Sequence, residues 1–256
     1  MRITTIINGK GGVGKTTTAH ALATGLTKKG LRTLAIDYDP QGNLSHVYGI
    51  DVNNSPTMYH VINGDIALPD AIQRSKQGDV IAGNSSLAKM SSRFAEDAIL
   101  EGILKLKEEL VKLEKKYKFI IIDNQPLLGS LLTMQTMVAA NDLLVPMSAD
   151  AFAVQGLAKL REAIIRIKQG YNPDLKIDGL LMTRYNPRIL HSNHINQNLI
   201  KWANGLDTRV YKTFIREGVA VREAHTKKQS IFDYAPLSNP AQDYNNLIAE
   251  YTGRKK

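Results

Sequence analysis

Gly9-Lys10-Gly11-Gly12-Val13-Gly14-Lys15-Thr16 lies near the start of this 256-residue chain and carries the spacing G-x-x-x-x-G-K-T. This spacing lets successive backbone N–H groups converge on a di- or triphosphate. Its glycines let the backbone turn where a Cβ would block the anion. The stretch therefore predicts a phosphate-binding loop, with nucleotide contacts from Gly11, Gly12, Val13, Gly14, Lys15, Thr16 and Thr17.

The residues on either side of the loop favour the strand and the helix that such a loop needs. Residues 2–7 (RITTII) are a β-branched run typical of a buried strand. Residues 16–23 open a helix whose N-terminal dipole favours phosphate groups. Lys15 is expected to meet the terminal phosphates, and the Thr16 hydroxyl is expected to reach Mg²⁺.

A second lysine, Lys10, lies at the tip of the loop. It cannot easily fold back onto phosphates that its own backbone already surrounds. A nucleotide held by another chain is a more natural partner, and a solvated loop charge is the alternative. The position of Lys10 therefore predicts a homodimer that forms with nucleotide.

The sequence KGGVGKTT at residues 10–17 resembles the deviant Walker A motif of the ParA/MinD group of P-loop ATPases. The resemblance implies that Lys10 crosses the interface of an ATP-sandwich dimer and that ATP with Mg²⁺ is the cofactor. It also implies further nucleotide contacts from Arg184 and Pro236. The catalytic residues that it implies are Lys10, Lys15 and Asp39.

Two acids follow apolar strand patterns downstream of the loop. Residues 34–43 (LAIDYDPQGN) end in a Pro/Gly turn, as expected at the carboxyl end of a central strand, where ligands bind. They are similar to the family's D-x-D-P-Q-x-N stretch, in which Asp39 matches the acid that orients the attacking water. Residues 117–123 (YKFIIID) end on Asp123 in the Walker B pattern, which places a carboxylate at the metal or one water away. The candidate metal residues are therefore Thr16, Asp39 and Asp123.

The segment after Asp123 departs from the family, which usually has D-T-P-P where this chain has Asp123-Asn124-Gln125-Pro126. Asn124 stays small and polar, but Gln125 replaces a proline with a flexible amide. Gln125 either helps to orient water, as glutamines do in some other nucleotide hydrolases, or is solvent-exposed with no role.

Length and composition favour a single domain over residues 1–256, which the loop motif and the resemblance identify as a P-loop ATPase domain. A hydrophobic content of 43% permits one sizeable core. The absence of cysteine excludes structural disulfides and thiolate metal sites. A strand-like start argues against a signal peptide, and no apolar run approaches the ~20 residues of a membrane span. The expected location is therefore cytoplasmic, and the resemblance to the ParA/MinD group implies association with the nucleoid.

Strand-like runs alternate with helical patterns, which predicts an α/β fold with a mostly parallel central sheet and helices on both faces. The residues from 51 to 79 form the loosest part. Before the Walker B strand, apolar residues at helical spacing predict an amphipathic helix that packs into the core through Ile99, Ile103, Leu106, Leu110 and Leu113. The expected strands are residues 2–8, 32–37, 79–82, 118–123, 142–147, 177–183 and, more weakly, 208–214.

Charge is unevenly distributed along the chain. Residues 184–256 hold twelve Lys and Arg against six Asp and Glu. Residues 215–224 (IREGVAVREA) resemble the carboxyl-terminal ParA motif, a region that binds DNA without sequence preference, which requires a basic patch facing phosphates. An ordinary solvated surface, with Glu217 and Glu223 as local counter-charges, is the alternative. The candidate DNA-binding residues are Arg188, Lys212, Arg216, Arg222, Lys227 and Lys228.

Two further features have ordinary structural explanations. His191 and His194 lie three residues apart without a third ligand, which favours a capped helix start over a metal site. Trp202 follows Leu199 and Ile200, and packing is a better explanation for it than base stacking.

Together these features predict a ParA-type partition ATPase. Its ATP-bound homodimer would bind DNA non-specifically, and hydrolysis stimulated by a centromere-binding, ParB-like partner would release it. The alternative is a MinD-type positioning switch that acts through protein or membrane partners. Membrane attachment is not expected, because residues 246–256 (NLIAEYTGRKK) hold only one short apolar cluster.

Overall fold

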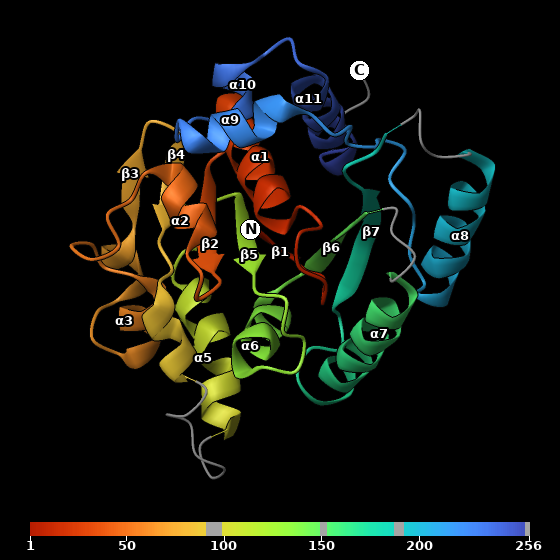
Figure 1. Cartoon of the computed structure of the whole chain (residues 1–256). Coiled ribbons are helices and arrows are strands. Elements are labelled where there is room, and N and C mark those ends of the chain that lie inside the picture. The colour runs from red at the N-terminus through yellow and green to blue at the C-terminus, as the bar shows by residue number, and fades with distance from the viewer. Residues whose placement is uncertain (91–98, 149–152, 187–191, 254–256) are drawn as a thin grey trace.

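The computed structural model of the chain describes residues 1–90, 99–148, 153–186 and 192–253. In this part of the chain, one seven-stranded sheet has the order β3-β4-β2-β5-β1-β6-β7 (Figure 1). The strands are β1 (Arg2–Ile6), β2 (Thr33–Tyr38), β3 (Gln73–Ser75), β4 (Gly78–Ile81), β5 (Phe119–Asn124), β6 (Asp142–Met147) and β7 (Lys176–Met182).

Every neighbouring pair of strands in the sheet is parallel except β3 and β4, so the predicted mostly parallel sheet is confirmed. The central strands are near-continuous apolar runs because helices cover both of their faces. β5 lies between β1 and β2, and Asp123 is the register partner of both Ile6 and Asp37. The loops that follow these three strands therefore meet at one edge of the sheet.

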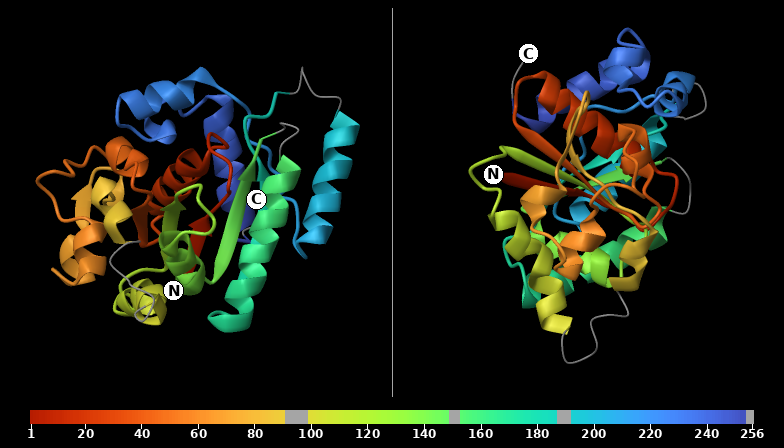
Figure 2. Two further views of the ribbon diagram at one scale, coloured as in Figure 1. Left: turned by 60° about the horizontal axis from the view of Figure 1, so that its bottom comes forward. Right: turned by 90° about the vertical axis from the view of Figure 1, so that its left-hand side faces the viewer.

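Helices flank the sheet on both faces, as predicted, and the two views of Figure 2 show both layers. One layer contains α1 (Lys15–Lys28), α2 (Asn43–Tyr48), α9 (Val219–Thr226), α10 (Ile231–Tyr234) and α11 (Asn239–Tyr251). The other contains α3 (Met58–Asn63), α5 (Ile99–Val111), α6 (Leu131–Ala139), α7 (Ala153–Gly170) and, beside β7, α8 (Ser192–Gly205). Short 3₁₀ helices span Leu68–Ala71 and Ser85–Lys89.

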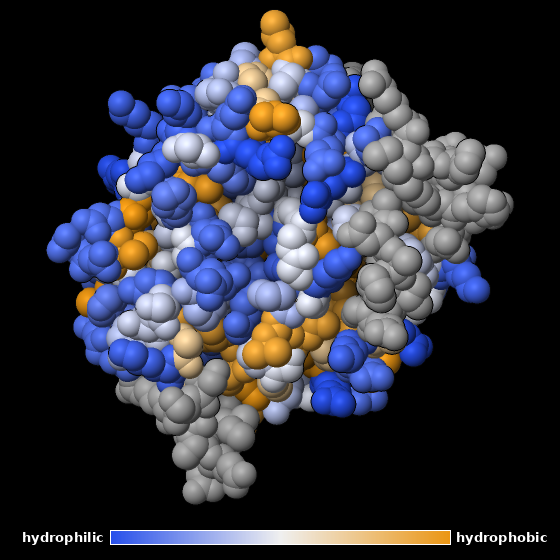
Figure 3. All heavy atoms as spheres, in the orientation of Figure 1, coloured by the Kyte–Doolittle hydropathy of each residue, from blue (hydrophilic) through white to orange (hydrophobic). Residues whose placement is uncertain are grey.

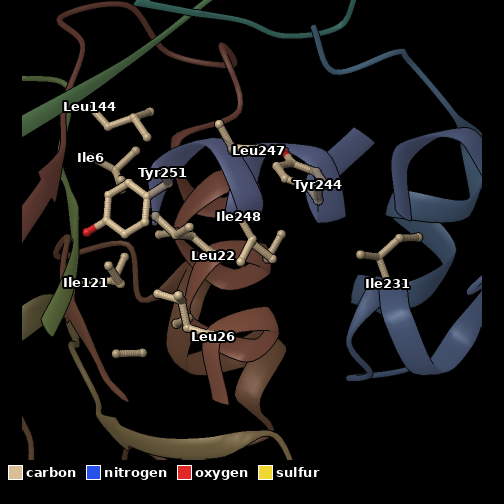
Figure 4. Close-up of a cluster of buried hydrophobic side chains, with 14 of the residues drawn as sticks. Ile6, Leu22, Leu26, Ile121, Leu144, Ile231, Tyr244, Leu247, Ile248 and Tyr251 are labelled. Carbon is tan, nitrogen blue, oxygen red and sulfur yellow. The ribbon is translucent and has the colours of Figure 1, made fainter. Parts of the chain in front are cut away.

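The carboxyl-terminal helix α11 packs tightly on α1. A Cβ on Gly25 of α1 would lie 2.1 Å from Cδ1 of Ile248, so glycine allows the two helices to approach. Figure 4 shows Leu22 and Leu26 of α1 in the same buried cluster as Leu247 and Ile248 of α11. The apolar face of α11 therefore belongs to the core.

The predicted amphipathic helix before the Walker B strand is confirmed as α5, which begins at Ile99. Along its apolar stripe, Ile103, Leu106 and Leu110 are buried, and so is Leu113 in the turn that follows Val111, the last residue of α5. Trp202 of α8 also packs against a core cluster, as predicted. Of the histidine pair, His191 lies outside the described residues, while α8 begins at Ser192.

Two predictions about elements are wrong. Residues 208–214 do not form a strand: Val210 makes only an isolated bridge with Leu180, next to the point where the Tyr211 ring covers Gly179. Residues 51–79 are not loose, since they contain α3, a 3₁₀ helix, β3 and the start of β4. Side chains from this segment fill the core beneath β2, among them Met58, Val61 and Leu68.

No helix in the described ranges combines the length and apolar character that crossing a bilayer requires.

Candidate nucleotide-binding site

The loop between β1 and α1 has the backbone that a phosphate-binding loop needs. Gly12 and Gly14 have positive φ values of 75° and 86°, a conformation that strains any residue with a Cβ. Gly14 is the N-cap of α1, and the first turn of α1 contains no acidic residue. The free N–H groups of this turn and the helix dipole therefore present positive potential to an anion.

Lys15 is buried at the start of α1, and its Nζ donates a hydrogen bond to the carbonyl oxygen of Lys10 at 2.9 Å. Burial lowers the pKa of the Lys15 ammonium, whereas the negative charges of Asp123 and Asp39 act in the opposite direction. The ammonium group is thus held inside the loop by one carbonyl, which a phosphate oxygen can replace.

Two buried acids face each other at the ends of β2 and β5. Asp37 accepts hydrogen bonds from the Ser45 N–H at 2.7 Å, the Ser45 hydroxyl at 2.6 Å and the Asp39 N–H at 3.2 Å. Burial nevertheless raises the pKa of Asp37 to about 6. Asp37 was not assigned a role from the sequence, although it stands two residues before Asp39 in the same motif.

Asp123 has no such support, because neither of its carboxylate oxygens has a hydrogen-bond partner among the described residues. Burial raises its pKa well above the usual range, and the charge of Asp37 adds to the effect. The Thr16 hydroxyl opposes this shift but forms no hydrogen bond of ordinary geometry with the carboxylate. A buried, unpartnered carboxylate fits a cation ligand.

These residues fit Mg²⁺, which proteins usually hold through one or two carboxylates together with substrate phosphates. Within the described ranges, no group of three or more His, Asp or Glu side chains gathers into an all-protein metal site. The arrangement therefore suits a cation that arrives with a phosphate group.

Asp39 lies in the turn after β2, where it is almost fully buried. Its Oδ1 accepts a hydrogen bond from the Gln41 N–H at 2.9 Å. The turn is also tied to the end of β4, because the Ser45 hydroxyl accepts from the Gly83 N–H at 2.8 Å. A Cβ on Gly83 would lie 2.5 Å from the Asp37 carbonyl oxygen, so only glycine fits this position. The turn is therefore built to hold Asp39 in place.

Gln125, the residue that departs from the family pattern, is half-buried and bonded. Its Nε2 donates to Oγ of Ser130 at 2.6 Å, and Ser130 is the N-cap of α6. The preceding Asn124 is fully buried and donates weakly to the Thr133 hydroxyl at 3.4 Å. The amide of Gln125 thus closes the loop between β5 and α6, a role that neither sequence interpretation included.

Two neighbouring hollows follow the loop. One, of about 360 Å³, is lined by Lys15, Thr16, Thr17, Asp39 and Gln41 among others. The second, of about 300 Å³, is lined by the apolar side chains of Ile215 and Val221 and the ring of Tyr244, together with the charged side chains of Arg184, Arg216, Glu217 and Arg222. Gly12, Gly14 and Thr17 line both hollows, so the two hollows lie next to each other beside the loop.

The two nucleotide contacts implied outside the loop have different positions. Arg184 lines the second hollow, and its guanidinium lies 3.4 Å from the Gly12 carbonyl oxygen. Pro236 is exposed between α10 and α11 and is not one of the described residues that line either hollow. Lys10 is half-buried at the loop, and its interfacial role stays a prediction.

The candidate DNA-binding residues do not form one equivalent set. Arg188 lies outside the described residues. Arg216 is paired with Asp243 of α11 through hydrogen bonds of 2.9 and 2.7 Å, a partner that the sequence analysis missed because it is 27 residues away. The others are exposed: Lys212 before α9, and Arg222, Lys227 and Lys228 on and after α9.

The chain is similar to known proteins over its whole length. A family model described as an AAA domain matches residues 1–177. The chain is 32% identical to the chromosome partitioning protein ParA of Caulobacter vibrioides over 260 residues, which covers 100% of this chain and 96% of the relative.

Solved structures are similar over the same length. Cobyrinic acid a,c-diamide synthase from Mycobacterium smegmatis, with a bound ATP analogue and magnesium, is 28% identical with a TM-score of 0.78, covering 100% of this chain and 98% of the other. The septum site-determining protein MinD of Pyrococcus horikoshii, complexed with Mg-ADP, is 26% identical with a TM-score of 0.76, covering 98% and 95%.

Proposed function

This chain belongs to the ParA-type family of P-loop ATPases, and on that premise we propose that it is an ATP-dependent DNA-partition ATPase. In the proposed cycle, ATP and Mg²⁺ join two copies face to face, and the homodimer binds DNA without sequence preference. Hydrolysis, stimulated by a centromere-binding, ParB-like partner, then releases the DNA. The protein would act in the cytoplasm, on the nucleoid.

The convergence of Lys15, Asp39 and Asp123 at one edge of the sheet carries the proposal. Lys15 would bind the terminal phosphates, and Thr16 with Asp123 would hold Mg²⁺ directly or through water. When bound, Mg²⁺ would supply positive charge that offsets the negative charge developing in the transition state. Asp39 would orient the attacking water. The M. smegmatis structure with an ATP analogue and magnesium supports this choice of ligand.

The second hollow supports a nucleotide rather than a free polyphosphate. Its walls include the apolar side chains of Ile215 and Val221 and the ring of Tyr244, which suit a planar base. Because it lies next to the phosphate hollow at Gly12 and Thr17, a single nucleotide can occupy both.

DNA binding is supported by the cations on and after α9. Arg222, Lys227 and Lys228 are all exposed, and hydrophilic residues cover much of the surface over α9 and α10 in Figure 3. Such a surface meets the requirement for contacts with phosphates that carry no sequence information.

A MinD-type positioning switch is the second candidate. The similarity to MinD of P. horikoshii favours it, as does the ion pair with Asp243 that neutralises Arg216. A membrane partner is disfavoured by α11, because Leu247, Ile248 and Tyr251 are buried against the core and do not face outward.

The test is size-exclusion chromatography combined with DNA retention, in ATP, in ADP and without nucleotide. A dimer that forms in ATP and is retained by unrelated DNA sequences supports partition. An ATP-dependent dimer that ignores DNA supports the positioning switch. Failure to bind ATP contradicts both functions.

A further inference from the structure

Arg184 has an unusual backbone for a residue with a long side chain. Its φ of 52° lies in the left-handed region, which is strained for a non-glycine residue. The residue directly follows β7 and the buried Thr183, whose hydroxyl donates to the Val13 carbonyl oxygen at 2.7 Å. The strained turn thus starts from a point anchored to the phosphate loop and directs the guanidinium over it.

The guanidinium of Arg184 bridges two segments that are far apart in the sequence. NH1 donates to the Gly12 carbonyl oxygen at 3.4 Å, a long hydrogen bond. Nε and NH2 both donate to Oε1 of Glu217, at 3.3 and 3.1 Å. Both side chains are about half exposed, so the ion pair contributes little to folding stability by itself.

The backbone that carries Glu217 is fixed from several sides. The Ile215 N–H donates to the Met182 carbonyl oxygen at 2.8 Å, and the Glu217 N–H donates to the Tyr185 carbonyl oxygen at 3.1 Å. The neighbouring Arg216 is held by Asp243 through both its backbone and its guanidinium. Glu217 therefore presents its carboxylate from a rigid support.

The Glu217 carboxylate lies where a negative charge is unfavourable for binding phosphate groups. Glu217 is the one acidic side chain among the described residues that line the second hollow, where it stands with Arg184, Arg216 and Arg222, next to a loop that would bind a polyanion. A carboxylate there repels phosphate groups, unless its charge serves to place a cation.

We propose that Glu217 is a positioning residue that holds Arg184 over the phosphate loop, so that the guanidinium donates to a phosphate oxygen of the bound nucleotide. This inference rests on the proposed ATP binding. The long contact with Gly12 is the bond that the nucleotide replaces, and the two bonds to Glu217 keep the guanidinium aligned. The ion pair already restricts the rotamers of Arg184 in the nucleotide-free protein, so nucleotide binding costs less side-chain entropy.

The test is a double-mutant cycle, with a non-hydrolysable ATP analogue and Mg²⁺ as the titrated ligand. Arg184→Gln is expected to weaken binding about tenfold, and Glu217→Gln threefold to tenfold. In the double variant, loss of Glu217 should add nothing to the loss of Arg184. Arg184→Lys, which keeps the charge but cannot make the fork-shaped contact, should bind nearly as weakly as Arg184→Gln.

The sign of the Glu217→Gln effect separates positioning from simple charge. If Glu217 only adds negative charge, its neutralisation must tighten binding of the polyanion. Glu223→Gln on α9 is the matched control, because it makes the same charge change outside both hollows. Tighter or unchanged binding by Glu217→Gln, or losses that multiply in the double variant, would overturn the proposal. A wild-type protein that does not bind the analogue would instead contradict the proposed function.

Discussion

Asp37 and Asp123 are register partners across β2 and β5, yet of these two buried carboxylates only Asp37 is hydrogen-bonded within the described part of the chain. The Asp37 carboxylate accepts hydrogen bonds from Ser45 and from the turn that holds Asp39. The carboxylate oxygens of Asp123, on the neighbouring strand β5 of the sheet, are available to a ligand. The same pair of strands thus supplies one acid that supports the turn and one that is available to a cation.

The first prediction concerns Asp123→Asn, which removes a buried charge that no hydrogen bond compensates. At pH 8 the free energy of unfolding of the nucleotide-free protein should rise by about 1 kcal/mol, while Mg²⁺-dependent affinity for ATP is lost. Urea unfolding and nucleotide titration measure the two effects. Asp37→Asn is the control and should destabilise the protein, because it disturbs the bonds to Ser45. Equal destabilisation by both variants would contradict the distinction between the two acids.

The two lysines of the loop should differ in their effects. Lys15→Ala should abolish ATP binding, since the buried ammonium lies among the loop carbonyls and the two acids. Lys10→Ala should bind ATP but fail to dimerise. Sedimentation with and without ATP distinguishes the two variants, and a normal ATP-dependent dimer of Lys10→Ala would rule out the face-to-face arrangement.

Asp39→Ala should dimerise with ATP but hydrolyse it at least a hundredfold more slowly, because its proposed role is to orient water. The variant should stay on DNA longer than the wild type. Phosphate release and DNA dissociation are the measurements. Turnover equal to that of the wild type would refute the role, whatever the effect on DNA.

Substitutions of Arg216 and Arg222 should differ in their effects on folding stability and on DNA binding. Arg216→Glu leaves the buried Asp243 without its partner and adds a like charge, so the free energy of unfolding should fall by about 2 kcal/mol. Arg222→Glu changes an exposed residue and should leave it within about 0.5 kcal/mol. Its DNA affinity should nevertheless fall on every sequence, with a salt slope lower by about 1. Lys201→Glu on α8 is the charge-matched control. If Arg222→Glu and this control bind DNA with equal affinity, the exposed cations on and after α9 are an ordinary solvated surface and not a DNA-binding site.

A pH dependence is expected from His20, which is buried between α1, α2 and α9. It hydrogen-bonds to Gln77 at 2.8 Å, and its ring lies 5.2 Å from Tyr48 and 5.5 Å from His225. Burial, with a smaller effect of His225, lowers its pKa to about 3. Below pH ~6.5 the unfolded chain therefore binds a proton that the folded chain does not.

Stability should consequently fall with pH from ~6.5 toward ~3, by about 2 kcal/mol at pH 5 from this residue. His20→Gln should reduce the difference in unfolding free energy between pH 7.5 and pH 5 by that amount. His225, whose pKa burial also lowers, is present in both proteins, so the comparison isolates His20. An identical pH profile for His20→Gln and the wild type would show that His20 does not cause the loss.

Local sequence patterns determined the phosphate loop, most strands, helix α5 and the acids Asp39 and Asp123. Each depends on residues close together in the chain: glycines at turns, apolar runs in buried strands, or an acid directly after a strand. These patterns also placed Asp39 and Asp123 at the same edge of the sheet, since the carboxyl ends of parallel strands share one edge.

Tertiary structure alone decided the partners of the two arginines beside the site, Arg184 and Arg216. Arg216 meets Asp243 on another helix, Arg184 meets Glu217 on another loop, and neither spacing follows a helix or strand period. Residues 208–214 have a strand-like composition, but their pairing with β7 is limited to one bridge. The physical reason is common to these cases. The partners of long side chains and of segments at the sheet edge depend on distances in the folded chain. These distances depend on how whole helices and strands pack, and not on the neighbouring residues in the sequence.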